Sequence, residues 1–190
     1  MNGIKVGYAL TGSFCTFEKS LNQMKKIKEN GAEIIPIMSF NASNLDTRFG
    51  KAEFFRDEIE KISQRSIIST IESAEPIGPK KLTDVLVVLP CTGNTLAKLA
   101  NGIYDTPVTL AVKSHIRNQR PVVIGVSSND SLSASAKNIG TLLNLKYYYF
   151  IPMRQDDYQK KPFSVVCDFE KTIETIEAAL YGKQIQPMLI

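Results

Sequence analysis

Small polar residues follow an apolar run in the middle of the sequence. Val85-Leu-Val-Val-Leu89 has the character of a buried strand, and Pro90-Cys-Thr-Gly-Asn-Thr95 comes directly after it. Hydroxyl, amide and glycine residues at a strand-to-helix junction allow backbone N–H groups and hydroxyls to close around an anion at the start of the helix. Phosphate is the commonest such anion. The stretch therefore predicts a phosphate-binding junction.

Three other apolar runs end in the same way. Thr11-Gly-Ser13 follows residues 4–10, Ser39 and Asn41 follow residues 33–38, and Ser127-Ser-Asn-Asp130 follows residues 121–126. The carboxyl ends of parallel strands share one edge of a sheet, so we expect these groups to meet there. Any one of them is equally well explained as a helix N-cap, which stabilises a helix by ~1 kcal/mol without a ligand. Four on one edge favour ligand binding.

Several ligand and site classes are excluded or disfavoured by missing motifs. The G-x-x-x-x-G-K-[ST] loop is absent, and Gly7-Tyr-Ala-Leu-Thr-Gly12 does not fit the G-x-G-x-x-G dinucleotide fingerprint. The sequence does not indicate a Ser-His-Asp catalytic triad, because the single histidine, His115, lies within a helical segment. The cysteines are three in number and far apart, which predicts neither a disulfide framework nor a zinc site.

Composition is that of an ordinary globular protein. The chain has 190 residues, of which 43% are hydrophobic and 22% charged, and this predicts one domain spanning residues 1–190. No apolar run reaches the ~20 residues of a membrane span, and no signal peptide is evident, so a cytoplasmic location is expected. The net charge of +4 comes from scattered lysine groups, which favours solvated surfaces over a nucleic-acid interface.

Strand-like and helix-like segments alternate along the chain. Strands are predicted at 4–10, 33–38, 85–89, 121–126 and 147–151, and helices at 16–30, 51–64, 94–101, 107–118, 131–144 and 169–181. Pro36 within the second strand indicates an edge position or a bulge. This order is typical of a parallel sheet covered on both faces. The predicted fold is a three-layer αβα sandwich of the Rossmann-like or flavodoxin-like type.

Two of the junctions carry a resemblance to a known family. Thr11-Gly-Ser13 together with Pro90-Cys-Thr-Gly-Asn-Thr95 is similar to the T-G-S and P-A-S-A-N-T motifs of the FMN-binding homo-oligomeric flavin-containing Cys decarboxylases. Essentially end to end, the chain also resembles the family of dipicolinate synthase B subunits. That likeness rests on AEPIGPKKL (74–82), PCTGNTLAKLANGI (90–103), the polar cluster at 155–162 and GKQIQP (182–187).

The resemblance implies a flavin site at matching positions. FMN is the implied cofactor, and the implied cofactor-binding residues are Gly12, Ser13, Phe14, Ser39, Pro90, Cys91, Thr92, Asn94, Thr95 and Ser127. Cys91, Thr92 and Gly93 replace the Ala, Ser and Ala of the decarboxylase motif, and no P-x-M-N-x-x-M-W stretch is present. These departures weigh against decarboxylation of a cysteine substrate and leave the flavin interpretation intact.

The resemblance also implies a reaction and a partner. A chain of this family would act in the cytoplasm of a sporulating cell with a dehydrogenase-like dipicolinate synthase A subunit that uses NADP, and would itself form a homo-oligomer. Aromatisation of a dihydropyridine ring removes a hydride and a proton, and the substrate carries two carboxylates. Cationic candidates for these carboxylates are Lys113, Arg117, Arg154, Lys160 and Lys161; catalytic candidates are Asp130, Asp156 and Cys91. A flavin-dependent decarboxylase and a non-catalytic partner subunit remain alternatives.

Overall fold

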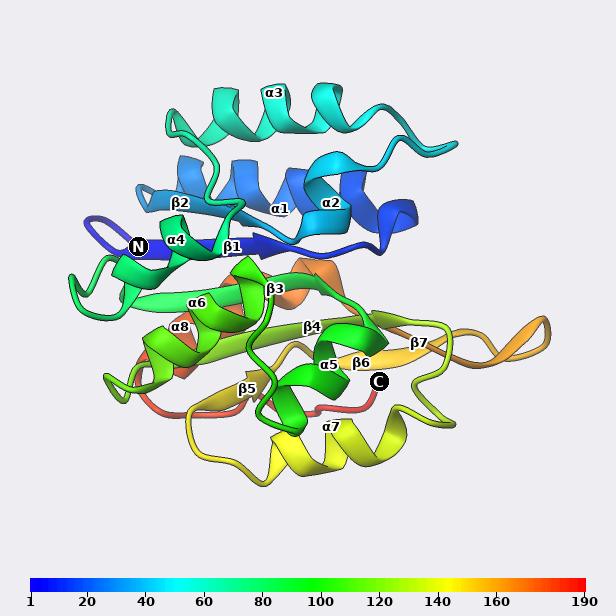
Figure 1. Cartoon of the computed structure of the whole chain (residues 1–190). Coiled ribbons are helices and arrows are strands. Elements are labelled where there is room, and N and C mark those ends of the chain that lie inside the picture. The colour runs from blue at the N-terminus through cyan, green and yellow to red at the C-terminus, as the bar shows by residue number, and fades with distance from the viewer.

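The apolar runs form the parallel strands of a single sheet. The computed structural model describes residues 1–190, with strands β1 (Lys5–Leu10), β2 (Glu33–Met38), β3 (Val85–Cys91), β4 (Val122–Ser128) and β5 (Tyr148–Phe150). They run in the order β2-β1-β3-β4, and β5 pairs with the first half of β4 (Figure 1). β2 is an edge strand, which confirms the position that Pro36 indicates.

An antiparallel hairpin completes the sheet. It consists of β6 (Met153–Asp157) and β7 (Lys161–Cys167), and β7 pairs with the end of β4 through Ser127 and Ser128. The sequence prediction of 147–151 as the last strand was therefore wrong. Three of the five β6 residues are exposed, so this strand lacks the apolar alternation from which a strand is recognised. In Figure 1 the hairpin projects beyond the carboxyl edge of the sheet.

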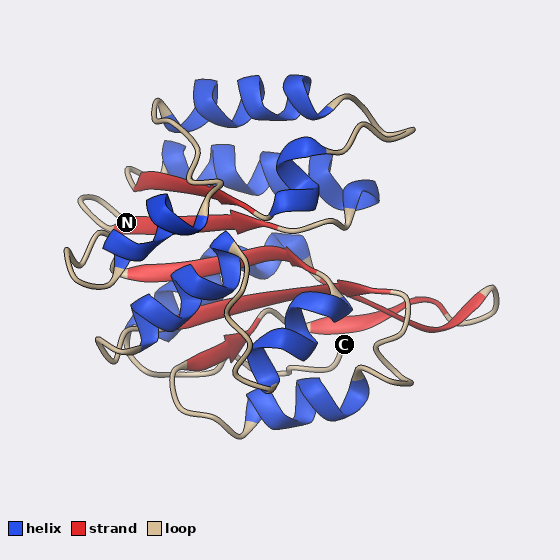
Figure 2. Cartoon of the chain, viewed as in Figure 1, coloured by secondary structure: helices blue, strands red, loops and turns tan.

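Helices cover both faces of the sheet (Figure 2). On one face lie α1 (Phe17–Glu29), α3 (Ala52–Ser63) and α8 (Thr172–Leu180), and on the other α4 (Ile71–Ala74), α5 (Gly93–Ala100), α6 (Pro107–Ile116) and α7 (Ala136–Leu143). The side chains of β3 alternate between the two cores, with Val85 and Val87 in the first and Leu86 and Val88 in the second. The predicted three-layer fold class is confirmed.

One predicted boundary differs from the structure. The helix expected at 131–144 begins only at Ala136, because residues 129–135 form turns around the side chain of Asp130. In α3, Phe55 packs in the core, whereas Phe54 is 58% exposed. Short elements complete the chain: a 3₁₀ turn at Phe14–Thr16, α2 (Phe40–Asn44), a 3₁₀ turn at Glu75–Ile77 and another at Phe169–Lys171. No helix has the length and apolar character needed to cross a bilayer.

Candidate ligand cavity at the carboxyl edge

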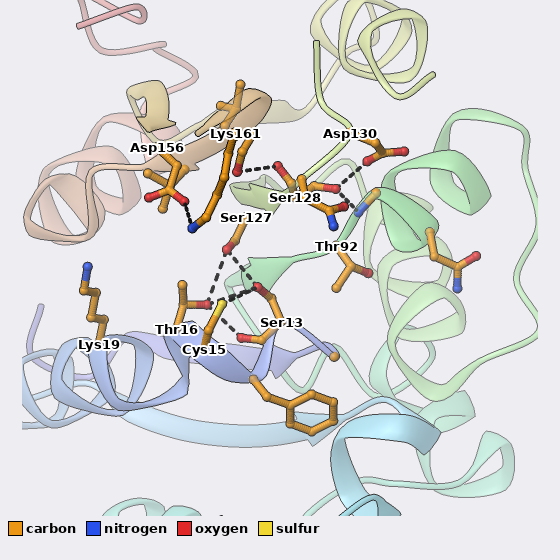
Figure 3. Close-up of a pocket in the computed structure, with 18 of the residues that line it drawn as sticks. Ser13, Cys15, Thr16, Lys19, Thr92, Ser127, Ser128, Asp130, Asp156 and Lys161 are labelled. Atoms are coloured by element: carbon orange, nitrogen blue, oxygen red, sulfur yellow. Dashed lines mark hydrogen bonds and ion pairs between the residues drawn. The ribbon is translucent and has the colours of Figure 1, made fainter. Parts of the chain in front are cut away.

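A cavity of about 860 Å³ opens at the carboxyl edge of the sheet. Its wall comes from the loops after β1, β3 and β4, from the start of α1 and from the hairpin; Phe49 is added by the loop before α3. The lining residues are Gly12, Ser13, Phe14, Cys15, Thr16, Lys19, Phe49, Thr92, Gly93, Asn94, Ser127, Ser128, Asn129, Asp130, Asp156, Lys161, Ser164, Val165 and Val166. Figure 3 shows how most of them converge.

A cluster of three hydroxyls lies in the middle of the cavity wall. Ser13 Oγ is 2.9 Å from Ser127 Oγ, and Thr16 Oγ1 is 3.4 Å from both of these oxygens (Figure 3). Thr16 also donates to the backbone carbonyl of Ser13 at 2.9 Å, which holds the loop after β1 in its turn. Because each hydroxyl can donate or accept, the cluster can reorient toward a phosphate or a hydroxylated ligand.

The junction of β3 and α5 presents a helix N-terminus to the same cavity. Thr11 accepts a hydrogen bond from the backbone N–H of Thr92 at 3.0 Å and donates to the carbonyl of Pro90 at 2.8 Å, so it ties the first junction to the second. Thr92 is the N-cap of α5 and accepts from the N–H of Thr95 at 3.3 Å. The first turn of a helix carries N–H groups without intrahelical acceptors and a partial positive charge.

Asp130 is held against this helix start. Its two carboxylate oxygens accept hydrogen bonds from Ser128 at 2.5 Å and from Ser135 at 3.0 Å, while Ser128 Oγ in turn accepts from the N–H of Gly93 at 3.2 Å. A Cβ on Gly93 would stand 2.5 Å from Asp130 Oδ1. Glycine is therefore required for this close approach of α5 to the loop after β4.

Charge is concentrated at the other end of the cavity. Lys161, at the start of β7, donates to Asp156 Oδ2 at 2.7 Å, and this hydrogen bond raises the pKa of the lysine above its ordinary value. Lys19, in the first turn of α1, takes part in no ion pair. In Figure 3, Lys19, Asp156 and Lys161 lie on one side of the hydroxyl cluster, and Thr92 and Asp130 lie on the other.

Two aromatic rings add flat apolar surface. Phe14 packs against Phe17 with ring centroids 5.0 Å apart, which anchors it to the first core. Phe49 is 46% exposed, and the guanidinium of Arg48 lies 4.9 Å from the centre of its ring. The cavity thus combines hydroxyls, a helix start, cations and aromatic faces, which suits a ligand with an anionic group, a polar chain and a flat ring.

Most of the predicted site residues meet in this cavity. Gly12, Ser13, Phe14, Thr92, Asn94, Ser127, Asp130, Asp156 and Lys161 all line it. Their individual roles stay predictions. Ser13 and Asn94, which come from different strand ends, share the one cleft, as the common-edge argument requires.

Four residues assigned to the flavin lie outside the cavity wall. Ser39 accepts from the N–H of Ala42 and serves as the N-cap of α2, and Thr95 is bonded to the Thr92 hydroxyl at 3.1 Å. Pro90 and Cys91 belong to β3, where Cys91 is fully buried. Burial raises the pKa of the Cys91 thiol, so it stays protonated and does not reach a ligand in the cavity. A catalytic role for Cys91 is thus at odds with its burial.

Of the five cationic residues predicted to bind the substrate carboxylates, only Lys161 lines the cavity. Lys113 and Arg117 end α6 beside the start of β4, at the amino edge of the sheet, and Lys113 stacks over Tyr104. Neither residue lines this cavity, because the crossover helices run antiparallel to the strands and finish at the opposite edge. Arg154 lines a separate, smaller groove, and Lys160 lies in the hairpin turn outside the wall.

Sequence reasoning missed several cavity residues. Thr16 and Lys19 lie three and six residues after Ser13, and this three-residue spacing was the available signal. Phe49 gave no signal, because it comes from an irregular loop before α3. Ser164, Val165 and Val166 belong to β7, which was not predicted.

Comparison with known proteins agrees with this architecture. The chain is 42% identical over 190 residues to the B subunit of dipicolinate synthase of Bacillus subtilis (strain 168), covering 100% of this chain and 95% of that protein. The crystal structure of the dipicolinate synthase B subunit from Bacillus halodurans C has a TM-score of 0.92 at 43% identity, covering 100% of this chain and 98% of that one.

A more distant structure shares the fold alone. Burkholderia xenovorans DmrB in complex with FMN, described as a cubic protein cage for redox transfer, has a TM-score of 0.70 at 17% identity, covering 94% of this chain and 96% of that one. The model of the Flavoprotein family matches residues 1–180. This chain belongs to the Flavoprotein family.

Proposed function

We propose that this chain is the FMN-binding B subunit of a dipicolinate synthase. With a dehydrogenase-like A subunit that uses NADP, it converts a dihydro- or tetrahydrodipicolinate to dipicolinate in the cytoplasm of a sporulating cell. The observation that carries the proposal is the single cavity in which an uncharged hydroxyl cluster and a helix start adjoin a lysine-bearing end. Full-length similarity to the B subunit of dipicolinate synthase supports the reaction class.

The cavity fits FMN by size and by donor chemistry. Its volume of about 860 Å³ lies within the range of small-molecule and cofactor sites, roughly 300–1,000 Å³. Ser13, Thr16 and Ser127 offer hydroxyls for a phosphate and ribityl chain, and the α5 N-terminus adds backbone donors. Phe14 and Phe49 offer faces for a flat ring.

A bound flavin supplies a hydride acceptor for oxidation of a dihydropyridine ring. The residues of the chain have the remaining tasks. Asp156 Oδ2 is bonded to Lys161, whereas its Oδ1 accepts no hydrogen bond within the chain and is free to take the proton that leaves the ring. Both oxygens of Asp130 are already bonded to serine hydroxyls, so Asp130 positions the start of α5 instead. The cations orient the carboxylates of the substrate.

Assembly belongs to the same proposal. We infer a homo-oligomer of this chain, consistent with the similarity in fold to a protein described as a cage. Residues 1–180, matched by one family model, would form one domain together with the C-terminal residues that pair with β6. Domain extent is tested by limited proteolysis, which should leave residues 1–190 as one resistant fragment.

The first test measures FMN binding. Purified protein reconstituted with FMN is expected to show the flavin absorbance bands, and Ser13→Ala should weaken FMN binding roughly 10-fold, the size of one charge-assisted hydrogen bond. The absorption spectrum shows the bands, and fluorescence titration measures the FMN affinity of each protein. Ser66→Ala is the matched control, because Ser66 is exposed and lies outside the cavity. Equal affinities of the two variants would show that the hydroxyl cluster does not hold the flavin.

The second test measures the reaction. Turnover of dihydrodipicolinate with the A subunit and NADP is compared for wild type and Asn94→Ala, with flavin content determined in parallel. Loss of flavin with full activity would contradict a flavin-centred mechanism and favour a non-catalytic partner subunit. Release of carbon dioxide without the A subunit would instead indicate a decarboxylase.

A further inference from the structure

The cavity holds one lysine that the fold leaves without a counter-ion. Lys19 is the third residue of α1, lies on the cavity wall and is absent from every ion pair of the chain. Two other lysines of the same helix are paired with acidic residues, Lys25 with Glu58 at 3.9 Å and Lys26 with Glu170 at 2.5 Å, whereas Lys28, outside the cavity, is not. Lys19 is therefore available to an anion from outside.

A second cation faces it from an element far away in sequence. Lys161 comes from the hairpin, and in Figure 3 its side chain extends toward the centre of the cavity while that of Lys19 extends from below. Asp156 accepts from Lys161 at 2.7 Å and is 39% exposed, so the pair lies open to the cavity and to solvent. An exposed ion pair is weak, and a ligand carboxylate can replace Asp156 as the partner of Lys161 at little cost.

We propose that Lys19 and Lys161 form a subsite for the carboxylate of a small aromatic dicarboxylate, with Asp156 as an internal competitor for Lys161. The inference rests on the proposed function and adds Lys19 as a substrate-binding and specificity-determining residue. The hydroxyl cluster of Ser13, Thr16 and Ser127 separates this subsite from the α5 N-terminus. A dicarboxylate held here would therefore lie beside a ligand that occupies the α5 end of the cavity.

The structure gives the two ends distinct charge. At the α5 end, Asp130 is the acidic side chain, and each of its oxygens accepts a hydrogen bond from a serine hydroxyl. At the charged end, where Lys19 and Lys161 lie, two lysines face one aspartate, which leaves an excess of one positive charge for an incoming carboxylate. The same excess is available to a phosphate, so the experiment must separate a substrate carboxylate from the phosphate of the flavin.

The probes are pyridine-2,6-dicarboxylate and, in parallel, FMN. Binding of the dicarboxylate to the FMN-loaded protein is measured by calorimetry, and flavin affinity is measured by fluorescence. Lys19→Gln is expected to weaken dicarboxylate binding about 10-fold, as for loss of a hydrogen bond to a charged group, and to leave flavin affinity within about 2-fold. Lys161→Gln should do the same. Controls are Lys25→Gln, on the far part of the same helix, and Lys160→Gln, the neighbour outside the wall.

Asp156→Asn is expected to change the dicarboxylate affinity in the opposite direction. Removing the competitor frees Lys161, so dicarboxylate binding should strengthen at least about 3-fold and depend more steeply on ionic strength. A variant that is merely misfolded cannot bind the probe more tightly. This result, together with the lysine variants, would establish the subsite.

The experiments distinguish failure of this inference from failure of the proposed function. If Lys19→Gln binds the dicarboxylate as the Lys25→Gln control does, the inference is wrong while the proposed function stands. If Lys19→Gln loses flavin and keeps dicarboxylate affinity, Lys19 is a ligand of the flavin phosphate and the inference is again wrong. If wild type binds no FMN, the proposed function fails, and the dicarboxylate titration of the flavin-free protein still decides the inference by the same comparison.

Discussion

At the residue scale, Gly93 shows how closely the cavity wall is packed. It begins α5, and a Cβ at this position would stand 2.5 Å from Asp130 Oδ1, 2.7 Å from Ser128 Oγ and 2.8 Å from Ser135 Oγ. These three groups are hydrogen-bonded to one another, so none can move aside without breaking a bond. Overfilling a packed site of this kind costs typically about 1–3 kcal/mol.

We therefore expect Gly93→Ala to lower the free energy of unfolding by about 1–3 kcal/mol and to weaken FMN binding. Gly140→Ala is the matched control, because Gly140 lies within α7 with no atom within 4 Å of its Cβ position. Alanine in an open helical position should stabilise the fold by about 0.5–1 kcal/mol. Urea denaturation measures both, and equal stability of the two variants would contradict the close packing at Gly93.

At the element scale, His115 joins α6 to the strands. Its Nδ1 is 2.9 Å from Thr83 Oγ1, before β3, and its Nε2 is 2.9 Å from the carbonyl oxygen of Pro121, before β4. The neutral ring satisfies both, accepting from Thr83 and donating to Pro121. Burial lowers the pKa of His115 to about 4, with the hydrogen bond to Pro121 acting in the opposite direction. Its position in α6 agrees with the helical segment that the sequence predicts around it.

The lowered pKa predicts loss of stability in weak acid. The unfolded chain protonates His115 near pH 6.5, whereas the folded chain does so near pH 4, so the unfolded state binds more protons in this window. The free energy of unfolding should thus fall between pH 7 and pH 5 by about 2 kcal/mol more in wild type than in His115→Gln. Chemical denaturation at both pH values measures the difference. Parallel pH profiles of the two proteins would show that the histidine is not buried in its neutral form.

The elements also show what the sequence could and could not predict. The α5 end of the cavity was predictable, because polar residues after parallel strands must share an edge, as Ser13 and Thr92 do. Crossover helices run antiparallel to the strands, so the same argument would have placed Arg117, at the end of α6, at the opposite edge. The charged end was not predictable in this way. Asp156 and Lys161 reach it because a largely polar hairpin folds back along β4, and that pairing leaves no apolar period in the sequence.

At the scale of the whole molecule, exposed apolar side chains gather on the hairpin and the C-terminal residues. Tyr158 and Phe163 are 69% and 54% exposed, and Leu189 and Ile190 are 71% and 48% exposed. The C-terminal residues run beside β6, where Met153 bonds to Met188 and Ile190, but this pairing stops at the start of the strand. The rest of β6 is an open strand edge, which in monomeric proteins is normally protected.

We therefore expect the hairpin to lie in a contact between copies of this chain. Light scattering coupled to gel filtration should give a mass that is a multiple of 21.1 kDa. Replacing both hairpin aromatics, Tyr158→Ser with Phe163→Ser, should shift that mass toward one chain, because it removes apolar surface that association buries. Tyr181→Ser is the control, since Tyr181 is 83% exposed and follows α8, away from the hairpin. A wild-type mass of one chain across the micromolar range, or equal shifts for the hairpin pair and the control, would exclude the hairpin as the contact. Circular dichroism of the double variant then separates loss of association from loss of fold.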